Sequence, residues 1–196
     1  MYENQKIGVV ILAYDVESFI RGVIEGLPGF VDKIYVVDDG SKDKTTEIVR
    51  SLTADVNNAT YNKVTLLNHT ANRGPGAGLQ TGYKAALLDS MDIIVKVDGD
   101  GQMRAEYMEN LIIPIVEKRA DYTKGNRLYN HAYQADMPRF RLFGNRILTW
   151  LTRIESGYWH ISDSQNGYTA ITQKALKTID LNFYKYYGYL NDILAK

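Results

Sequence analysis

The first hundred residues alternate short apolar runs with segments of helical periodicity, and no other feature constrains the fold as much. Apolar and β-branched residues fill four runs, at Ile7–Tyr14, Lys33–Asp39, Val64–Asn68 and Asp92–Val97. Segments with apolar residues at helical spacing separate them, at Val16–Leu27, Lys42–Ala54 and Ala77–Ser90. Because buried strands joined by helices are typical of parallel sheets, the pattern predicts an α/β fold. We expect a doubly wound, mostly parallel, Rossmann-like sheet with helices on both faces.

The pattern is less regular after residue 100. We expect helices at Arg104–Lys118, Arg139–Ile154 and Gln173–Ile179, and strands at Ala120–Lys124 and Tyr168–Ile171. The segment Asn126–Met137 has no periodicity, which predicts a mobile loop that closes over the site. The apolar stripe of the predicted helix at Arg139–Ile154 indicates either a helix that faces the core or one that lies on a membrane surface. Ser41 is the expected N-cap of the second helix.

The composition argues against several classes of protein. The chain has 196 residues with 23 basic and 23 acidic side chains, which argues against a nucleic-acid-binding protein that works through a basic field. It has no cysteine and three scattered histidines, so we expect no disulfide, cysteine nucleophile or zinc site. No apolar run approaches the ~20 residues that a membrane span requires. We expect residues 1–196 to form a single domain, trimmed before C-terminal membrane segments because the chain ends inside a helical pattern.

The most informative polar motif follows the fourth apolar run, where residues 98–102 read Asp-Gly-Asp-Gly-Gln. Side chains two residues apart on a strand point to the same face, so the two carboxylates lie together. Carboxylate and amide oxygens suit Mg²⁺ or Mn²⁺, which would join Asp98, Asp100 and Gln102 to a diphosphate. A polar turn at a strand end is the simpler alternative. The metal site is favoured because other polar residues also lie at the carboxyl ends of strands, where α/β sheets bind ligands: Tyr14, Asp39 and His69.

Four motifs together resemble those of family 2 glycosyltransferases, which have the GT-A fold. They are Leu12-Ala13-Tyr14-Asp15-Val16-Glu17, Val36-Val37-Asp38-Asp39-Gly40-Ser41, Asn72-Arg73-Gly74-Pro75-Gly76 and Asp98-Gly99-Asp100-Gly101-Gln102. The pattern is similar to that of dolichol-phosphate mannose synthases and of bacterial enzymes that load sugars onto polyprenyl phosphate, and the resemblance extends from Ile7 to about Asp192. The first motif departs from the usual Pro-x-Tyr-Asn-Glu of the family, since it has Leu12, Asp15 and Val16.

The resemblance implies an inverting, metal-dependent glycosyltransferase that uses Mg²⁺ or Mn²⁺ and a UDP- or GDP-linked sugar. The implied acceptor is a polyprenyl phosphate, undecaprenyl or dolichyl, and the implied location is the cytoplasm, at the inner face of the membrane. A lipid phosphate is already an anion and needs no base, whereas a hydroxyl acceptor requires a carboxylate to take its proton. A transferase that builds a polysaccharide on a saccharide hydroxyl is therefore the main alternative.

The resemblance also assigns roles to individual residues. The nucleotide sugar would contact Leu12, Tyr14, Glu17, Val37, Asp39, Asp98, Gly99, Asp100 and Arg127. The metal ion would be held by Asp98, Asp100 and Gln102. On the acceptor side, the candidates are Asp163 near the reacting sugar, Asp192 as a base, and Arg139 and Arg141 for the lipid phosphate. Structural roles, as caps, turn residues or a surface arginine, are the alternatives for Asp39, Asp163, Asp192 and Arg127.

Three other classes of protein share parts of these motifs. Asp-x-Asp-Gly also occurs in the nucleophile loop of haloacid-dehalogenase-type phosphatases, but that loop follows the first core strand and continues with threonine, where this chain has Gln102. Four glycines resemble a dinucleotide-binding fingerprint: Gly74, Gly76, Gly78 and Gly82. However, several residues separate the first of them from the preceding strand. A non-catalytic sugar-nucleotide-binding domain would fit the altered first motif, but the retained carboxylates favour an enzyme.

Overall fold

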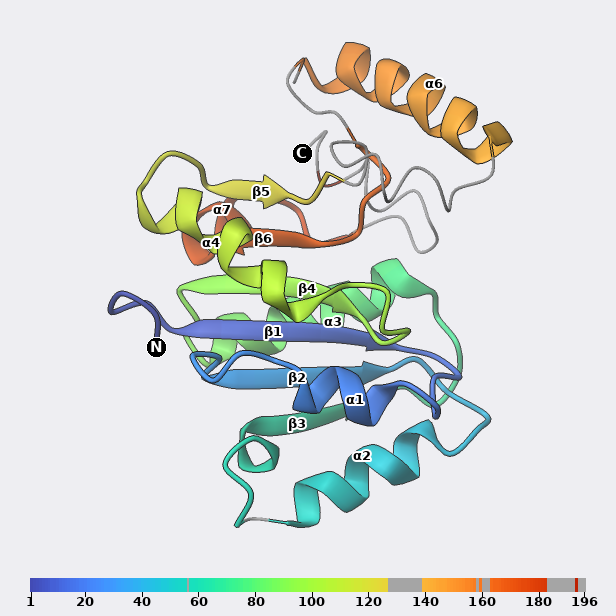
Figure 1. Ribbon diagram of the computed structural model, residues 1–196, viewed down its shortest axis with the longest axis vertical. Helices are drawn as coiled ribbons and strands as arrows, with labels where there is room; N and C mark the ends of the chain where they lie inside the picture. Colours follow the sequence, from blue (N-terminus) through green and yellow to red (C-terminus); the bar gives the residue numbers. More distant parts are fainter. Residues whose placement is uncertain (56, 127–138, 158, 160–162, 183–192, 194–196) are drawn as a thin grey trace.

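The centre of the molecule is a six-stranded sheet (Figure 1). The computed structural model describes residues 1–55, 57–126, 139–157, 159, 163–182 and 193. Within them the strand order is β3-β2-β1-β4-β6-β5. The strands are β1 (Ile7–Ala13), β2 (Lys33–Asp38), β3 (Val64–Asn68), β4 (Ile93–Asp98), β5 (Tyr122–Lys124) and β6 (Thr169–Thr172). β1 to β4 are parallel to their neighbours in that group, whereas β6 is antiparallel to both β4 and β5, so the sheet is mixed.

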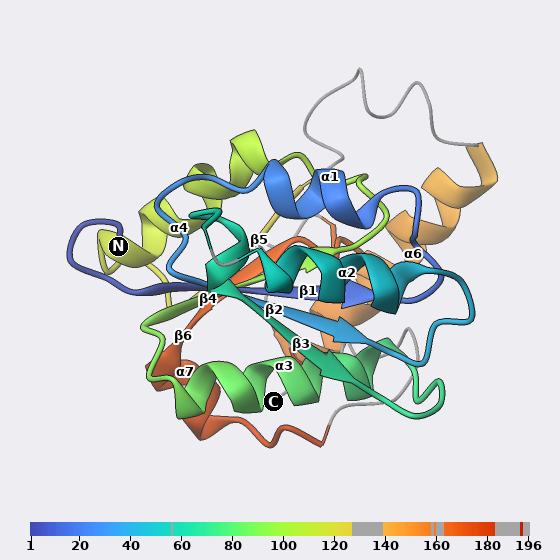
Figure 2. The same cartoon turned by 90° about the horizontal axis from the view of Figure 1, so that it is seen from below.

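Helices cover both faces of the sheet (Figure 2). One face carries α1 (Ile20–Glu25), α2 (Thr45–Ala54) and α4 (Met108–Val116), and the other carries α3 (Pro75–Leu88) and α7 (Gln173–Thr178). Short 3-10 helices precede β3 and α4, at Tyr61–Lys63 and Ala105–Tyr107. Alternate residues of β1 belong to the two cores, since Val9 and Ile11 pack with α1 and Val10 packs with α3. The predicted α/β sheet with helices on both faces is confirmed.

The carboxyl ends of the parallel strands form one edge of the sheet, and this edge positions the site. The register pairs Leu12 of β1 with Asp98 of β4. Just beyond the strands, the backbone N–H of Asp39 donates to Ala13 O at 2.9 Å and that of Gly99 donates to Leu12 O at 2.8 Å. Asp39 and the loop after Asp98 are therefore fixed on opposite sides of β1.

The predicted strands agree with the structure to within two residues, but three helices begin later than predicted. Helix α1 begins at Ile20 where Val16 was predicted, α2 begins at Thr45 where Lys42 was predicted, and α4 begins at Met108 where Arg104 was predicted. The prediction of Ser41 as an N-cap is wrong. The residue before α2 is Lys44, and the Ser41 hydroxyl instead donates to Asp38 at 2.5 Å. The residues that precede α1 and α2 form hydrogen bonds between two loops instead of helical turns. Helix propensity, which is a local property of the sequence, does not reveal such contacts.

Helix α6 (Arg139–Ser156) buries polar side chains and exposes apolar ones. It lies outside the two helical layers, beyond the β5 side of the sheet (Figure 1). Thr149 and Thr152 are 4% and 3% exposed, and the Thr149 hydroxyl lies 3.3 Å from that of Ser164. Five large apolar side chains of this helix are 42–56% exposed: Ile147, Leu148, Trp150, Leu151 and Ile154. The core-facing alternative therefore does not hold for these five residues.

Other expectations concern segments that the structure describes in part or not at all. No helix among the described residues is long and apolar enough to cross a membrane. The predicted loop at 126–137 lies outside the described residues except for Asn126. The helical pattern at the end of the chain also lies outside them, except for Ile193.

Candidate active site

The loops that precede α1 and α2 at the carboxyl edge are joined by hydrogen bonds. The first turns of these two helices were predicted at these positions. The carboxylates of Asp15 and Glu17 accept hydrogen bonds from the backbone N–H groups of residues 42 and 44, at 2.7 and 2.8 Å. In the opposite direction, the backbone N–H of Glu17 donates to the Asp43 carboxylate at 2.9 Å. Asp15 has a φ of +51°, a conformation that aspartate and asparagine adopt more readily than most side chains. The Glu17 carboxylate, predicted to contact the nucleotide sugar, thus holds the loop before α2.

Asp38 is a buried carboxylate that holds the turn after β2. It is 0% exposed, and it accepts hydrogen bonds from the Ser41 backbone N–H at 3.0 Å, from the Ser41 hydroxyl at 2.5 Å and from the Thr46 hydroxyl. No role for Asp38 is predicted from the sequence. A signal was present, because a carboxylate at the end of a buried strand needs donors, and three hydroxyl side chains follow within eight residues: Ser41, Thr45 and Thr46.

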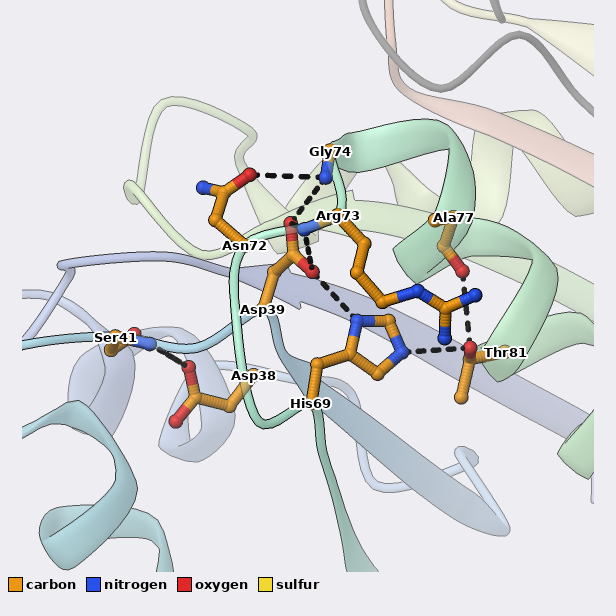
Figure 3. Close-up of polar contacts among 9 residues, drawn as sticks. All are labelled: Asp38, Asp39, Ser41, His69, Asn72, Arg73, Gly74, Ala77 and Thr81. Carbon is orange, nitrogen blue, oxygen red and sulfur yellow. Dashed lines mark hydrogen bonds and ion pairs between the residues drawn. The ribbon is translucent and has the colours of Figure 1, made fainter.

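Asp39 points away from that turn, toward the start of α3 (Figure 3). Its carboxylate accepts hydrogen bonds from the backbone N–H of Arg73, at 3.0 and 3.1 Å, and from that of Gly74, at 2.7 Å. Its Oδ1 also lies 2.6 Å from Nδ1 of His69. A carboxylate has about four acceptor positions, so these three donors leave about one for a ligand. Asp39 thus holds the segment before α3 and not the start of α2, and its contact with a nucleotide stays a prediction.

His69 has hydrogen-bond partners at both ring nitrogens. Its Nε2 lies 2.9 Å from the Thr81 hydroxyl, which donates to Ala77 O at 3.0 Å (Figure 3). The Asp39 carboxylate accepts from Nδ1, because a carboxylate offers only acceptor positions. The His69 ring thus connects Asp39, just beyond β2, to Thr81 in α3. Sequence analysis placed His69 at this edge but found no partner, because Asp39 lies 30 residues away.

The Asp-x-Asp loop follows β4 at the same edge. Asp98 and Asp100 are partly exposed, and Gln102 is exposed. Asp98 Oδ1 accepts a hydrogen bond from the Lys96 ammonium group at 2.5 Å, and Asp100 Oδ1 accepts one from the Gln102 backbone N–H at 3.0 Å. Within the described part of the chain, no hydrogen bond reaches the second oxygen of either carboxylate. Oδ2 of Asp98 lies beside Gly167, and Oδ2 of Asp100 belongs to a partly exposed side chain.

This set of donors fits a hard divalent cation. The available ligand atoms are oxygens, and Mg²⁺ is typically bound by one or two carboxylates together with substrate phosphates. The described residues contain no group of three histidine, cysteine, aspartate or glutamate side chains that could hold a metal ion. An ion held by Asp98, Asp100 and Gln102 would therefore take further ligands from a diphosphate or from water.

The segment 163–168 packs directly against the Asp-x-Asp loop. Gly167 makes this close approach possible, because a Cβ at this position would lie 2.5 Å from Lys96 Nζ and 3.1 Å from Asp98 Oδ2. Asp163 and Ser164 of the same segment are 2% and 0% exposed. The fold therefore brings together the predicted metal-binding motif and the predicted acceptor-side motif, which are more than sixty residues apart in the sequence.

The remaining predicted site residues are placed in different ways. Tyr14 is 41% exposed and Leu12 is half-buried, both at the carboxyl edge. Val37 is 0% exposed and packs in the core beside α3, so its side chain is not available to a nucleotide. Two predicted residues, Arg127 and Asp192, lie outside the described residues. Arg139 and Arg141 belong to α6, but their side chains also lie outside the described part of the structure.

The glycines of α3 serve packing and do not form a dinucleotide-binding turn. Helix α3 begins at Pro75, and residues 69–74 separate it from β3. A Cβ at Gly82 would lie 2.3 Å from Val10 Cγ1, so the helix packs against β1 where a larger side chain would not fit. The rival interpretation of these glycines as a dinucleotide-binding fingerprint therefore lacks the tight strand-turn-helix geometry that it requires.

A cavity of about 300 Å³ lies behind the Asp-x-Asp loop, on the α1 side of the sheet. Its walls include Phe19, Val23, Val97, Met103, Met108 and Tyr168. The Tyr168 hydroxyl is buried without a hydrogen-bond partner among the described residues, and burial raises the pKa of Tyr168. Sequence analysis did not identify this cavity, because separate segments of the chain form its walls.

Comparisons with known proteins agree with this geometry. The profile described as Glycosyl transferase family 2 matches residues 8–180. A UDP-N-acetylglucosamine–dolichyl-phosphate N-acetylglucosaminyltransferase of Methanococcus voltae is 35% identical over 184 residues, which cover 90% of this chain and 73% of the relative. A polyprenol monophosphomannose synthase of Mycolicibacterium smegmatis is 29% identical over 156 residues, which cover 80% of this chain and 57% of the relative.

The fold also matches a solved structure. Glucosyl-3-phosphoglycerate synthase from Mycobacterium tuberculosis, in complex with Mn²⁺, UDP and glucosyl-3-phosphoglycerate, superposes with a TM-score of 0.71 at 20% sequence identity. The match covers 97% of this chain and 64% of that one, so this chain spans slightly less than two thirds of its length. The likeness confirms the predicted GT-A fold.

Proposed function

The chain belongs to glycosyl transferase family 2, and we propose that it transfers a sugar, with inversion, from a UDP-linked donor to a polyprenyl phosphate. The observation that carries the proposal is the edge where the carboxylates of Asp98 and Asp100 lie beside the segment 163–168, each with one oxygen that accepts no hydrogen bond from the described residues. We further propose that residues 1–196 form a single catalytic domain. The name of the 35% identical relative from Methanococcus voltae supports both the type of donor and the type of acceptor.

The hydrogen bonds of Asp39 support a uridine nucleotide over a guanosine nucleotide. Three donors already occupy its carboxylate, which leaves about one of four acceptor positions. Uracil presents one ring N–H, whereas guanine presents a ring N–H and an amino group side by side. The UDP in the similar solved structure is consistent with this preference. In this proposal Tyr14 and Leu12 contact the base and ribose beside Asp39.

In the proposed reaction Asp98, Asp100 and Gln102 would hold a Mg²⁺ or Mn²⁺ ion that also binds the diphosphate. When bound, the ion neutralises charge on the departing diphosphate. The residues of this chain fix the loop, since the Gly99 N–H donates to Leu12 O at 2.8 Å and keeps both carboxylates at the edge. The acceptor oxygen attacks the anomeric carbon opposite the diphosphate, so the new bond forms as the old one breaks and the configuration inverts. Arg127 would pair with phosphate oxygens of the donor.

A phosphate acceptor is supported by the chemistry of the acceptor side. A phosphate monoester, with a second pKa of about 6, is largely a dianion at neutral pH and needs no general base. Asp163, the candidate carboxylate that the structure describes there, is 2% exposed, which favours a structural role over proton transfer with solvent. Asp192 would be required as a base only if the acceptor were a hydroxyl. The proposed contacts of Arg139 and Arg141 are with the lipid phosphate.

We also propose that the enzyme works on the cytoplasmic surface of a membrane. The apolar face of α6, defined by Ile147, Leu148, Trp150, Leu151 and Ile154, supports this because these side chains are 42–56% exposed while Thr149 and Thr152 of the same helix are buried. A helix with such a face binds at the boundary between headgroups and acyl chains. The polyprenyl substrate would be presented at the same surface.

The donor is tested by calorimetry with UDP and GDP in the presence of Mn²⁺. The proposal expects UDP to bind at least about tenfold more tightly than GDP, and a clear preference for GDP would contradict the argument from Asp39.

The acceptor is tested by UDP release from a panel of UDP-sugars. Vesicles that contain polyprenyl phosphate should stimulate release, whereas soluble oligosaccharides should not. Stimulation by oligosaccharides alone, lost in Asp192→Asn, would favour the polysaccharide-building alternative.

A further inference from the structure

Lys96 is a lysine buried in the middle of the sheet. It is 0% exposed, and its position in β4 pairs with Val10 of β1 and Thr169 of β6. A buried ammonium group is costly unless an opposite charge compensates for its lost hydration. Asp98 provides that charge, since its Oδ1 lies 2.5 Å from Nζ of Lys96. The two residues are two positions apart on one strand and therefore share a face.

The ion pair connects the interior of the sheet to the site. The side chain of Lys96 is 1% exposed, whereas that of Asp98 is 34% exposed. Gly167 lies against the pair, because a Cβ there would be 2.5 Å from Nζ of Lys96 and 3.1 Å from Oδ2 of Asp98. Lys96 is thus a fixed positive charge beside the ion-binding edge that acts on the edge through Asp98.

We propose that Lys96 is a positioning residue that makes binding of the divalent ion depend on binding of the nucleotide diphosphate. This inference rests on the proposed function. The charge of Lys96 offsets that of Asp98, so the Asp-x-Asp pair carries about one net negative charge instead of two. A divalent ion alone is then attracted weakly. The diphosphate anion is attracted by the same lysine and supplies oxygens to the ion, so each partner raises the affinity for the other.

Removal of the lysine charge should move the two affinities in opposite directions. Lys96→Met keeps a side chain of similar length but leaves two carboxylates without the cation. We expect the affinity for Mn²⁺, measured without nucleotide, to rise about tenfold. We expect the affinity for UDP, measured without metal, to fall about tenfold, because a nearby positive charge is lost. A residue that only stabilises the sheet would weaken both affinities or change neither.

The experiment measures Mn²⁺ binding by electron paramagnetic resonance titration, with and without UDP, and UDP binding by calorimetry in EDTA. Lys33→Met is the matched control. Lys33 is the first residue of β2, so it lies at the end of the parallel strands away from the carboxyl edge, and it forms an ion pair with Asp89 at 3.9 Å. This control should change neither affinity. Circular dichroism and thermal denaturation report whether each variant folds. Lys96→Gln, whose amide can still donate to Asp98, is the second variant if Lys96→Met does not fold.

Opposite shifts in a folded Lys96 variant, absent from Lys33→Met, would support the inference. Parallel shifts, or no shift, would overturn it. If neither variant folds, the wild-type protein decides, because the inference requires Mn²⁺ to bind at least about tenfold more tightly with UDP than without it. Equal affinity in the two conditions would overturn it. Failure of the wild-type protein to bind UDP even with Mn²⁺ would instead contradict the proposed function.

Discussion

Asp38 and Asp39 are adjacent residues whose carboxylates hold different segments on the two sides of one turn. Replacement of Asp38 by alanine removes hydrogen bonds from Ser41 and Thr46 and leaves the partly buried N–H of Ser41 without its acceptor. We expect Asp38→Ala to lower the free energy of unfolding by about 3 kcal/mol. Urea denaturation measures the change. A loss below about 0.5 kcal/mol would show that the turn after β2 does not depend on this carboxylate.

Asp100 should be essential to the metal-dependent binding of nucleotide and dispensable for the fold. Its side chain is partly exposed and lies outside the apolar cores, so Asp100→Ala removes an ion ligand without opening a cavity. We expect the thermal midpoint to change little and Mn²⁺-dependent UDP binding to be lost in calorimetry. Asp180→Ala, at an exposed aspartate outside the predicted site, is the control and should bind like the wild type. Unchanged affinity in Asp100→Ala would rule out the predicted metal site.

The contact between the two loops should make stability depend on pH through Asp43. Burial raises the pKa of Asp43, but hydrogen bonds from the Thr45 side chain and from the backbone of Glu17 and Thr45 outweigh it, so the pKa is lowered from 3.8. A lowered pKa in the folded state contributes stability above about pH 3.8, which is lost as the pH falls through the folded value. Asp43→Asn should therefore be less stable than the wild type at pH 7, and urea denaturation should show the difference shrinking below pH 3.8. A constant difference would contradict this role.

At the scale of elements, strands were predicted more accurately than helix starts for a physical reason. A buried strand requires a continuous apolar run, and this requirement is visible in the sequence over β1, β2 and β4. The start of a helix depends on which groups satisfy its first N–H donors. Here residues before α1 and α2 bond to each other across about 26 residues of sequence, so local signals such as Ser41 were misleading.

Helix α6 is the element whose exposed face most directly predicts an interaction. We expect Leu151→Asp to weaken binding to anionic vesicles at least about threefold, because it places a charge where apolar contact with the bilayer is proposed. Leu151 is 49% exposed, so the substitution should not destabilise the fold. Leu88→Asp is the matched control, since Leu88 is 86% exposed at the end of α3. Co-sedimentation with vesicles measures binding, and equal effects of the two variants would argue against α6 as the docking surface.

At the scale of the whole molecule, the sequence predicted the sheet, its helices and the edge that carries the site, because these follow from strand periodicity and chain connectivity. It did not predict the Lys96–Asp98 pair, the His69–Asp39 pair or the burial of Asp163, since each depends on packing between segments. It also did not predict that the Val37 side chain lies in the core. Polar residues near one edge could be identified as a group, but their partners could not.

The most direct test of the account is isolation of the product formed from a UDP-sugar, Mn²⁺ and polyprenyl phosphate in liposomes. The account predicts a lipid-linked sugar phosphate whose anomeric configuration, determined by nuclear magnetic resonance, is opposite to that of the donor. Formation of this product should be abolished in Asp100→Ala and reduced in Arg141→Ala. Sugar transfer to a soluble saccharide with none to the lipid, or a lipid product that retains the configuration of the donor, would contradict it.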